Sequence, residues 1–296
     1  MDKLDKEKYQ QAGEIGRDVR EWSKTLIKPG ISFLDLANKI ESRIAKLGAE
    51  IAFPVNICVN DITAHYAPGY RDESVIGAND VVTVDLGAHV DGFISDTAYT
   101  VDLSGKHKKM LKANQEALDA AIELVAPGVS VSEIGHRVQE LIISAGYKPI
   151  ENLTGHEIKQ YDLHAGLSIP NIDVPYDRKI KKDMILAIEP FATNGLGRVI
   201  ESPRTEIYSL IEPKSVRMNE ARILLRELAE RRKLPFAARW FTDKINPMRL
   251  ELALRKMASM KILKTHPVLH EKEKGIVSQF EHTMIVTSSG CEVTTI

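Results

Sequence analysis

Two aspartates interrupt a segment whose other residues favour buried β-strands. Asp85 and Asp96 lie in VVTVDLGAHVDGFISDTAYTVDL (81–103), among Val, Leu, Phe and Ile, although acids are depleted in strands. The segment predicts a hairpin. A loop centred on Val90-Asp91 would place the two acids directly opposite each other, whereas an Asp91-Gly92 loop would place them diagonally. Both registers put the two carboxylates on one face of the sheet.

Two carboxylates on a semi-buried face repel each other, so either one of them stays protonated or a cation binds between them. A metal ion would resolve the repulsion. The alternative is that one Asp belongs to the turn and the other reaches solvent, as a single strand aspartate usually does. Two such acids on one face make this alternative less attractive.

Three further residues have side chains that can bind metal. His156 lies in NLTGHEIKQYDLHAGLSIP (152–170), Glu189 ends the apolar run MILAIEP, and Glu281 interrupts the strand-like run IVSQFEHTMIV. Each is weak alone, because a single His is more often structural and an interior Glu can pair with Lys or Arg. By themselves these residues predict a cleft enzyme with clustered acids and histidines.

Composition excludes several classes of protein. The 296 residues carry 40 Lys and Arg against 41 Asp and Glu, so no bulk positive field attracts nucleic acid or anionic lipid. Cys58 and Cys291 are too few for a disulfide framework. The charged N-terminal residues do not form a signal peptide, and no apolar run is long enough to cross a membrane. We therefore expect a cytoplasmic protein.

One segment is repeated. PGISFLDLANKIESRIAKLG (29–48) aligns without gaps with PGVSVSEIGHRVQELIISAG (127–146), at an offset of 98 residues. Each copy has a Ser that can cap a helix, an acid three residues later, apolar residues at helical spacing and a final Gly. Helical stretches at about 5–27 and 106–125 precede the copies, and strand-like sequence follows them. A duplicated helix-helix-sheet unit is predicted, unless two good helix caps look alike by chance.

The second half is interrupted by helical sequence at 214–264, which predicts an insertion between two strands. It contains the basic cluster Arg231, Arg232 and Lys233. Such a cluster usually marks a solvated helix end, and a ribosomal or peptide partner is the less favoured interpretation.

With these motifs together, the chain resembles the pita-bread metallopeptidases, which include methionine aminopeptidases, prolidase and aminopeptidase P. It is most similar to the type 2 methionine aminopeptidases, on AHYAPG (64–69), GHEIKQYDLHAGLSIP (155–170), IEPFATNG (188–195), QFEHT (279–283) and the insertion between Glu189 and Glu281. The resemblance implies an α+β pita-bread fold with a pseudo-two-fold axis. It divides the chain into a catalytic domain (1–213 and 265–296) and a helical insertion (214–264).

The resemblance also implies a site for two divalent ions, Co, Mn, Fe or Zn, which suit a mainly oxygen ligand set. Asp96 and Glu281 would bridge the ions, Asp85 would complete one, and His156 and Glu189 would complete the other. Glu189 would also move protons during hydrolysis. His164 would donate a hydrogen bond to the substrate carbonyl or its oxyanion, and His65 would face the same cleft. Phe53 and Leu163 match positions that line the methionine pocket.

The implied substrates are nascent polypeptides with an N-terminal methionine, and we expect a monomer with no membrane or nucleic-acid partner. Ribosome contact stays open, because the lysine- and acid-rich extension of eukaryotic members does not occur in this sequence. His266 and His270 precede Glu281 where family members are expected to vary, which leaves the contacts to the leaving peptide undecided. Two alternatives remain: an Xaa-Pro peptidase of the prolidase or aminopeptidase P type, and a pita-bread module that binds peptide or RNA without catalysis.

Overall fold

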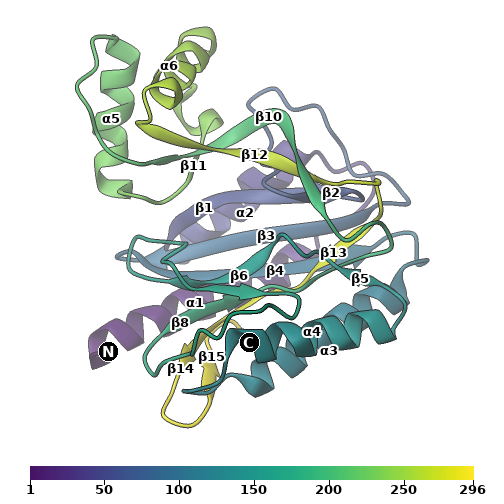
Figure 1. Cartoon of the computed structure of the whole chain (residues 1–296). Helices are drawn as coiled ribbons and strands as arrows, with labels where there is room; N and C mark the ends of the chain where they lie inside the picture. The colour runs from purple at the N-terminus through teal and green to yellow at the C-terminus, as the bar shows by residue number, and fades with distance from the viewer.

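The computed structural model describes residues 1–296, and its helices pack against several small antiparallel sheets (Figure 1). In the first half, two helices cover a three-stranded sheet. These are α1 (Lys3–Lys24) and α2 (Phe33–Lys46), with β1 (Glu50–Val59), β3 (Val81–Val90) and β4 (Phe93–Asp102). The protein is α+β, as the sequence predicts, and none of its helices combines the length and the apolar character that crossing a membrane requires.

The second half repeats this arrangement with a five-stranded sheet. Its helices are α3 (Lys108–Leu124) and α4 (Val131–Ser144), and its sheet has the order β15-β14-β8-β6-β7. The strands are β6 (Thr154–Ile158), β7 (Ser168–Pro170), β8 (Ile185–Ile188), β14 (His282–Val286) and β15 (Cys291–Val293). A smaller sheet beside it contains β5 (Lys148–Pro149), β9 (Phe191–Thr193) and β13 (Val277–Gln279).

The two helices predicted from the repeat are confirmed. α2 and α4 are each 14 residues long, and their first residues lie 98 positions apart, which is the offset of the repeat. Ser32 caps α2, and Ser130 with Glu133 forms a capping box at the start of α4. Each helix buries its apolar face in a separate core, one in each half of the chain. The caps and the periodicity were therefore enough to locate both helices.

Beside the acids, an antiparallel bridge between Ala98 and Glu281 joins strands of the two halves. The backbone N–H of Glu281 donates to the carbonyl of Ala98 (3.1 Å), and the hydroxyl of Thr97 donates to the carbonyl of Glu281 (2.8 Å). The hydroxyl of Thr283 bonds both backbone groups of Asp96, at 2.8 Å each. These bonds hold Asp96 of the first half and Glu281 of the second half at a fixed distance.

The insertion lies on two long paired strands, β10 (Val199–Leu210) and β12 (Leu263–Glu271), which also pair with β2 (Ile62–Ala64) and β11 (Phe236–Ala237). It contains α5 (Asn219–Arg231), a short 3₁₀ helix (Ala238–Phe241) and α6 (Pro247–Ser259), at the top of Figure 1. These helices share their own apolar cluster. We propose the division into 1–213 with 265–296 and 214–264 on this basis.

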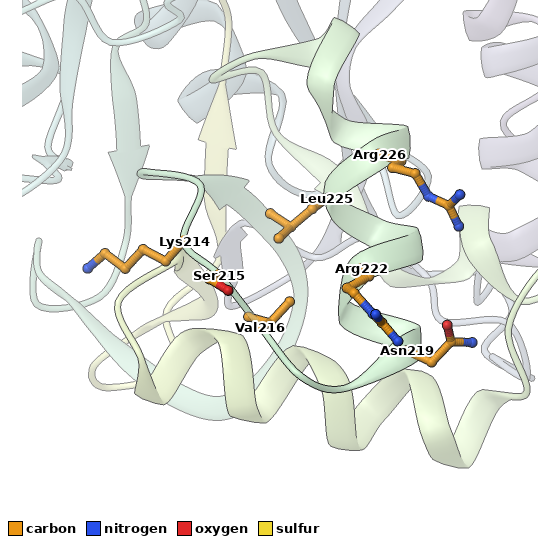
Figure 2. Close-up of a pocket in the computed structure, with 7 residues that line it drawn as sticks. All are labelled: Lys214, Ser215, Val216, Asn219, Arg222, Leu225 and Arg226. Carbon is orange, nitrogen blue, oxygen red and sulfur yellow. The ribbon is translucent and has the colours of Figure 1, made fainter.

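The insertion is anchored to α2 on one side and exposes a basic hollow on another. The guanidinium of Arg239 pairs with the buried Glu41 of α2, and the indole N–H of Trp240 donates to the same carboxylate at 2.9 Å. At the start of α5, Lys214, Asn219, Arg222 and Arg226 line a hollow that contains no acid (Figure 2). The insertion is thus fixed on its inner side and basic on this outer side.

Arg20 of α1 links that helix to strands of both halves. It is 7% exposed, and its Nη1 donates to the Thr97 hydroxyl and the Thr295 carbonyl (both 2.9 Å) and to Nδ1 of His282 (3.0 Å). Because an arginine can only donate, Nδ1 of His282 is the acceptor. Burial lowers the pKa of His282 to about 3, which keeps that ring neutral.

Replacing Arg20 with Met should lower the free energy of unfolding by about 2–4 kcal/mol, because three buried acceptors lose a charged donor. Urea unfolding followed by circular dichroism would measure the change. Arg17→Met is the matched control, since Arg17 of the same helix is more exposed and its guanidinium bonds only its neighbour Asp18. An equal cost for both variants would contradict this role of Arg20.

Candidate metal centre and active site

All nine residues singled out from the sequence line one cleft between the two halves, with a volume of about 240 Å³. They are Phe53, His65, Asp85, Asp96, His156, Leu163, His164, Glu189 and Glu281. Both halves and the β10–β12 pair contribute to the lining, and no Lys or Arg is part of it. The acids in the cleft therefore have no basic side chain to neutralise them.

Asp85 and Asp96 come from the predicted hairpin, in the second of its two registers. Gly87 lies opposite Asp96 and Ala98 lies opposite Asp85, so the two acids are diagonal neighbours on one face. The loop is Asp91-Gly92, with φ of 50° and 83°, the positive values that a two-residue turn of this kind needs. The register with a loop centred on Val90-Asp91 is wrong, because Gly92 is the residue that accepts such a conformation without cost.

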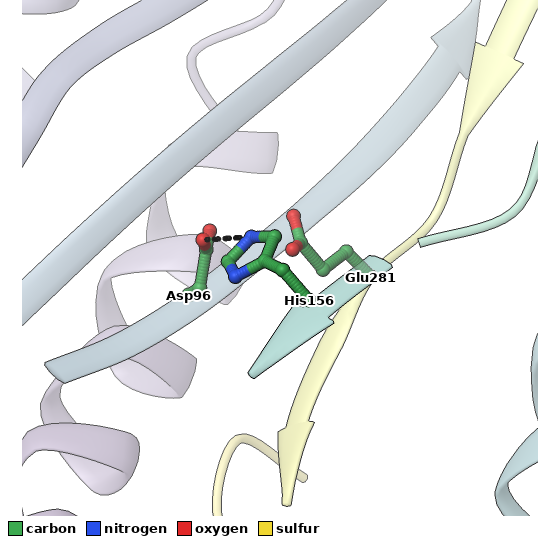
Figure 3. Close-up of side chains that lie close together, drawn as sticks. All are labelled: Asp96, His156 and Glu281. Carbon is green, nitrogen blue, oxygen red and sulfur yellow. Dashed lines mark ion pairs between the residues drawn. The ribbon is translucent and has the colours of Figure 1, made fainter. Parts of the chain in front are cut away.

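His156, at the middle of β6, lies near one acid of each half. Its Nε2 lies 3.6 Å from Oδ2 of Asp96 and 3.6 Å from Oε1 of Glu189. Asp96, His156 and Glu281 offer ligand atoms within 4.8 Å of one another (Figure 3). These separations are too long for hydrogen bonds. They suit groups that share a cation.

Several carboxylate oxygens in the cleft lack a partner. Oδ1 of Asp85, Oδ1 of Asp96 and Oε1 of Glu281 are buried without a hydrogen bond. The one amide that serves the acids is Gln279, whose Nε2 donates to Glu189 at 3.2 Å and to Glu281 at 3.5 Å. Buried polar atoms are rarely left unpaired in folded proteins. The free oxygens therefore fit a set of hard ligands for divalent cations.

Burial dominates the protonation of these groups. It raises the pKa of Asp85 to about 7 and raises the pKa of Asp96, Glu189 and Glu281 well above the ordinary range, where repulsion among the carboxylates adds to it. Burial lowers the pKa of His156 to about 4, so its ring stays neutral and keeps a lone pair for a metal. The site is thus destabilised when its acids ionise without a cation.

Three more histidines form a cluster beside the acids. The rings of His156 and His164 lie 4.3 Å apart, and those of His65 and His266 lie 5.6 Å apart. Desolvation within the cleft, followed by the other histidines, lowers the pKa of His164, although its side chain still reaches solvent. Burial also lowers the pKa of His65. Neutral imidazoles are therefore available near pH 7, and each can donate from one nitrogen and accept at the other.

The tautomer of His65 follows from its contacts. Its Nδ1 lies 3.1 Å from the carbonyl oxygen of Pro267, which can only accept, so Nδ1 carries the hydrogen. Nε2 is then an acceptor. His65 also has φ of 64°, an uncommon conformation for a residue with a side chain and one that concentrates at functional sites.

Phe53, on β1, and Leu163, in the loop after β6, are apolar residues that both line the cleft and belong to one buried cluster. The ring of Phe53 lies directly over Gly87, where a Cβ atom would come within 2.3 Å of Cε1. Gly87 is needed here because the strand must allow this close approach.

The sequence did not identify several lining residues. Gln279 lies two residues before Glu281, which places both side chains on one face of an extended chain, and Asn56 pairs with Asp85 in the β1–β3 register. His266 lies in the cleft, with Nε2 3.0 Å from the Ser209 hydroxyl. His270 does not line the cleft, and its Nδ1 lies 3.1 Å from Oδ2 of Asp61. The two-residue spacing of Gln279 and Glu281, which puts both side chains on one face of a strand, was the one signal that could have identified Gln279.

Metal-free protein should lose stability as Asp85 ionises. Because its folded-state pKa is about 7 against an ordinary value of 3.8, the unfolded chain loses this proton first, and the folded state is increasingly penalised as the pH rises between these values. Asp85→Asn removes the penalty. The free energy of unfolding of the variant relative to wild type should therefore rise with pH, by roughly 2–4 kcal/mol.

Urea unfolding with a chelator at pH 4.5 and 7.5 would measure this difference. Asp91→Asn is the control from the same hairpin, because a hydrogen bond from Lys8 lowers the pKa of Asp91 and reverses the expected direction. A difference for Asp85→Asn that stays flat or falls with pH would contradict the raised pKa.

Comparisons with known proteins agree with this geometry. Residues 7–288 match metallopeptidase family M24. The chain is 45% identical over 294 residues to the methionine aminopeptidase of Pyrococcus abyssi, covering 99% of this chain and 100% of that protein. Its fold matches the crystal structure of methionine aminopeptidase from Thermotoga maritima (TM-score 0.74, 21% identity, covering 100% and 98% of the two chains). It also matches the structure of a thermophilic Arx1 (0.87, 14%, 99% and 91%). The chain belongs to metallopeptidase family M24 and has its pita-bread fold.

Proposed function

We propose that this protein is a methionine aminopeptidase that removes the N-terminal methionine from nascent polypeptides. The observation that carries the proposal is a cluster of four carboxylates and one imidazole beside an apolar pocket, in which Asp96, His156 and Glu281 are buried and Asp85 and Glu189 are partly buried. It occurs on a chain that is 45% identical over nearly its whole length to methionine aminopeptidases. The reaction is hydrolysis of a peptide bond.

Two divalent metal ions, Co, Mn, Fe or Zn, fit the ligand set. Asp96 and Glu281 would bridge the ions, Asp85 would complete the ligands of one, and His156 and Glu189 would complete those of the other. The unpaired oxygens of Asp85, Asp96 and Glu281 support this assignment. When bound, such ions activate a water molecule for attack and polarise the scissile carbonyl.

The chain's own residues would bind the substrate and move protons. Glu189, whose Oε2 accepts from Gln279, would take a proton from the attacking water and pass it to the leaving amine. Neutral His164 would donate a hydrogen bond to the carbonyl oxygen. Nε2 of His65 is an acceptor, so it would receive a hydrogen bond from a substrate N–H. Donor and acceptor would thus fix the substrate's amide from two sides.

The side chain of the first residue would enter the apolar part of the cleft, between Phe53 and Leu163. An apolar wall suits the unbranched thioether of methionine, which adapts to irregular pockets.

Two other functions have less support. An Xaa-Pro peptidase would use the same five ligands, but the relatives at 45% identity are methionine aminopeptidases. A peptide- or RNA-binding module without catalysis would not need four acids clustered in one cleft, two of them buried. All five ligand residues are present here and lie in one cleft.

We also propose a cytoplasmic monomer that works at the ribosome. The two free cysteines suit a reducing compartment. Residues 214–264 carry 14 Lys and Arg against 5 Asp and Glu. Arg222 and Arg226 at the hollow in Figure 2 are exposed, and no acid lines that hollow. An anionic ribosomal surface would suit this face.

The function is tested by peptide cleavage. Wild-type protein loaded with Mn or Co should release methionine from Met-Gly-Met, leave Ala-Pro intact and lose activity to a chelator. Asp96→Asn should abolish activity and reduce the metal content below two ions per chain. Asp91→Asn, exposed in the same hairpin, should retain both. Cleavage of Ala-Pro in preference to Met-Gly-Met would identify an Xaa-Pro peptidase, and two bound metals in Asp96→Asn would exclude bridging by Asp96.

Removing the imidazole of His164 should lower kcat by about 10²- to 10³-fold, as expected for one donor to a developing oxyanion. The metal content should not change, because His164 is not among the proposed ligands. His270→Ala is the matched control, since His270 does not line the cleft. An unchanged kcat in His164→Ala would exclude the donor role.

A further inference from the structure

The chain that follows α5 turns inward and reaches the cleft. Leu234 is fully buried in the cluster that contains Phe53 and Leu163. The next residue, Pro235, lines the cleft itself. The insertion therefore supplies part of the pocket wall, directly after the basic cluster at 231–233.

Arg231 bonds the strand that bears Phe53. Its Nη2 donates to the carbonyls of Ile51 (3.0 Å), Ala52 (3.2 Å) and Pro235 (2.7 Å). The β1–β3 register shifts between Ile51 and Phe53, so the ladder is irregular where these carbonyls lie. An irregularity of this kind leaves backbone groups without ladder partners. Arg231 donates to these carbonyls immediately before Phe53 and so links the strand to the insertion.

Arg232 and Lys233 contact the segment that bears Leu163. The guanidinium carbon of Arg232 lies 4.2 Å from the centre of the Tyr161 ring, and Nζ of Lys233 pairs with Oδ2 of Asp162 at 2.7 Å. Leu163 and His164 follow directly along the chain. The three adjacent basic residues thus contact both segments: Arg231 bonds the strand that bears Phe53, and Arg232 and Lys233 contact the segment that bears Leu163.

We propose that the segment Arg231–Pro235 is a specificity element that sets the distance between the Phe53 and Leu163 walls of the pocket. Leu234 and Pro235 are the spacer, and the three basic residues are positioning residues that fasten it to both walls. The inference rests on the proposed function, because it assumes that this pocket receives the side chain of the first substrate residue. The ligand it selects is an unbranched apolar side chain.

A purely stabilising contact would have a different effect on the kinetics. If the segment only supports the fold, its loss lowers thermal stability and treats all substrates alike. If it sets the width of the pocket, its loss changes the ratio of kcat/KM between substrates with different first residues. The change should appear mainly in KM, because the catalytic groups are untouched.

The first experiment compares wild type, Arg231→Met and Arg231→Lys on Met-Ala-Ser and Leu-Ala-Ser, with the metal content of each measured. Arg231→Met should lower the Met:Leu ratio of kcat/KM about tenfold, as expected for lost bonds from a charged donor, with kcat for Met-Ala-Ser within twofold. Arg231→Lys should recover part of the ratio. Lys256→Met is the control, since Lys256 is an exposed residue of the same insertion outside the cleft, and its ratio should equal that of wild type.

A second experiment uses the ion pair between Lys233 and Asp162. It tests the specificity role of the segment even if Arg231→Met does not fold. Lys233→Glu should lower the Met:Leu ratio about two- to fivefold, because it places two acids together at the Leu163 wall. Adding Asp162→Lys restores the pair with reversed charges and should restore the ratio.

An unchanged ratio in both Arg231→Met and Lys233→Glu would overturn the inference. A fall of kcat together with loss of metal would also overturn it, since the contact would then support the ligands. Failure of wild-type protein to cleave Met-Ala-Ser would instead refute the proposed function, before any variant is compared.

Discussion

Four carboxylates share a cleft whose lining includes no Lys or Arg. The repulsion among these carboxylates is the constraint on which the structure depends. Buried acids at this spacing drive each other apart unless the backbone holds them. The bridge between Ala98 and Glu281 and the two bonds of the Thr283 hydroxyl do this for Asp96 and Glu281. Helix α1 supports the same strands through Arg20. The rigid frame and the unsatisfied acids together create a site that a divalent cation stabilises.

The duplication supplies this frame by repeating one helix-helix-sheet unit. Each half buries two helices on its own sheet, so each half has its own core and neither depends on the cleft for apolar burial. The contact between the halves combines the polar groups of the cleft with an apolar cluster that contains Phe53 of the first half and Leu163 of the second. The hairpin of β3 and β4 brings two acids, and the strands β6, β8 and β14 of the second half bring His156 and the residues next to Glu189 and Glu281. Chemistry is concentrated where the two cores meet.

Local signals in the sequence predicted most of the helices and strands. Contacts between residues far apart in the sequence could not be predicted in this way. Caps and helical spacing located α2 and α4, and the apolar runs located the hairpin. The choice between two loop registers needed the conformation of Gly92. The ligand roles came from a family resemblance, because a single His or Glu carries too little information. The contact of Arg231 with Ile51 spans 180 positions, and no periodicity links such residues. A basic cluster that looks like a solvated helix end could therefore not be assigned to the pocket.

Gly87 has a consequence for engineering this pocket. A methyl group there would come within 2.3 Å of the Phe53 ring, so this ring, which lines the cleft, would have to move. Attempts to select for a smaller first residue can therefore begin with one added carbon on β3, without altering any residue that contacts the substrate's backbone. Selection for a larger residue has no such route, because nothing can be removed from glycine. A library for that purpose has to vary Leu163 and Leu234, which belong to the same cluster as Phe53 and have side chains that can be shortened.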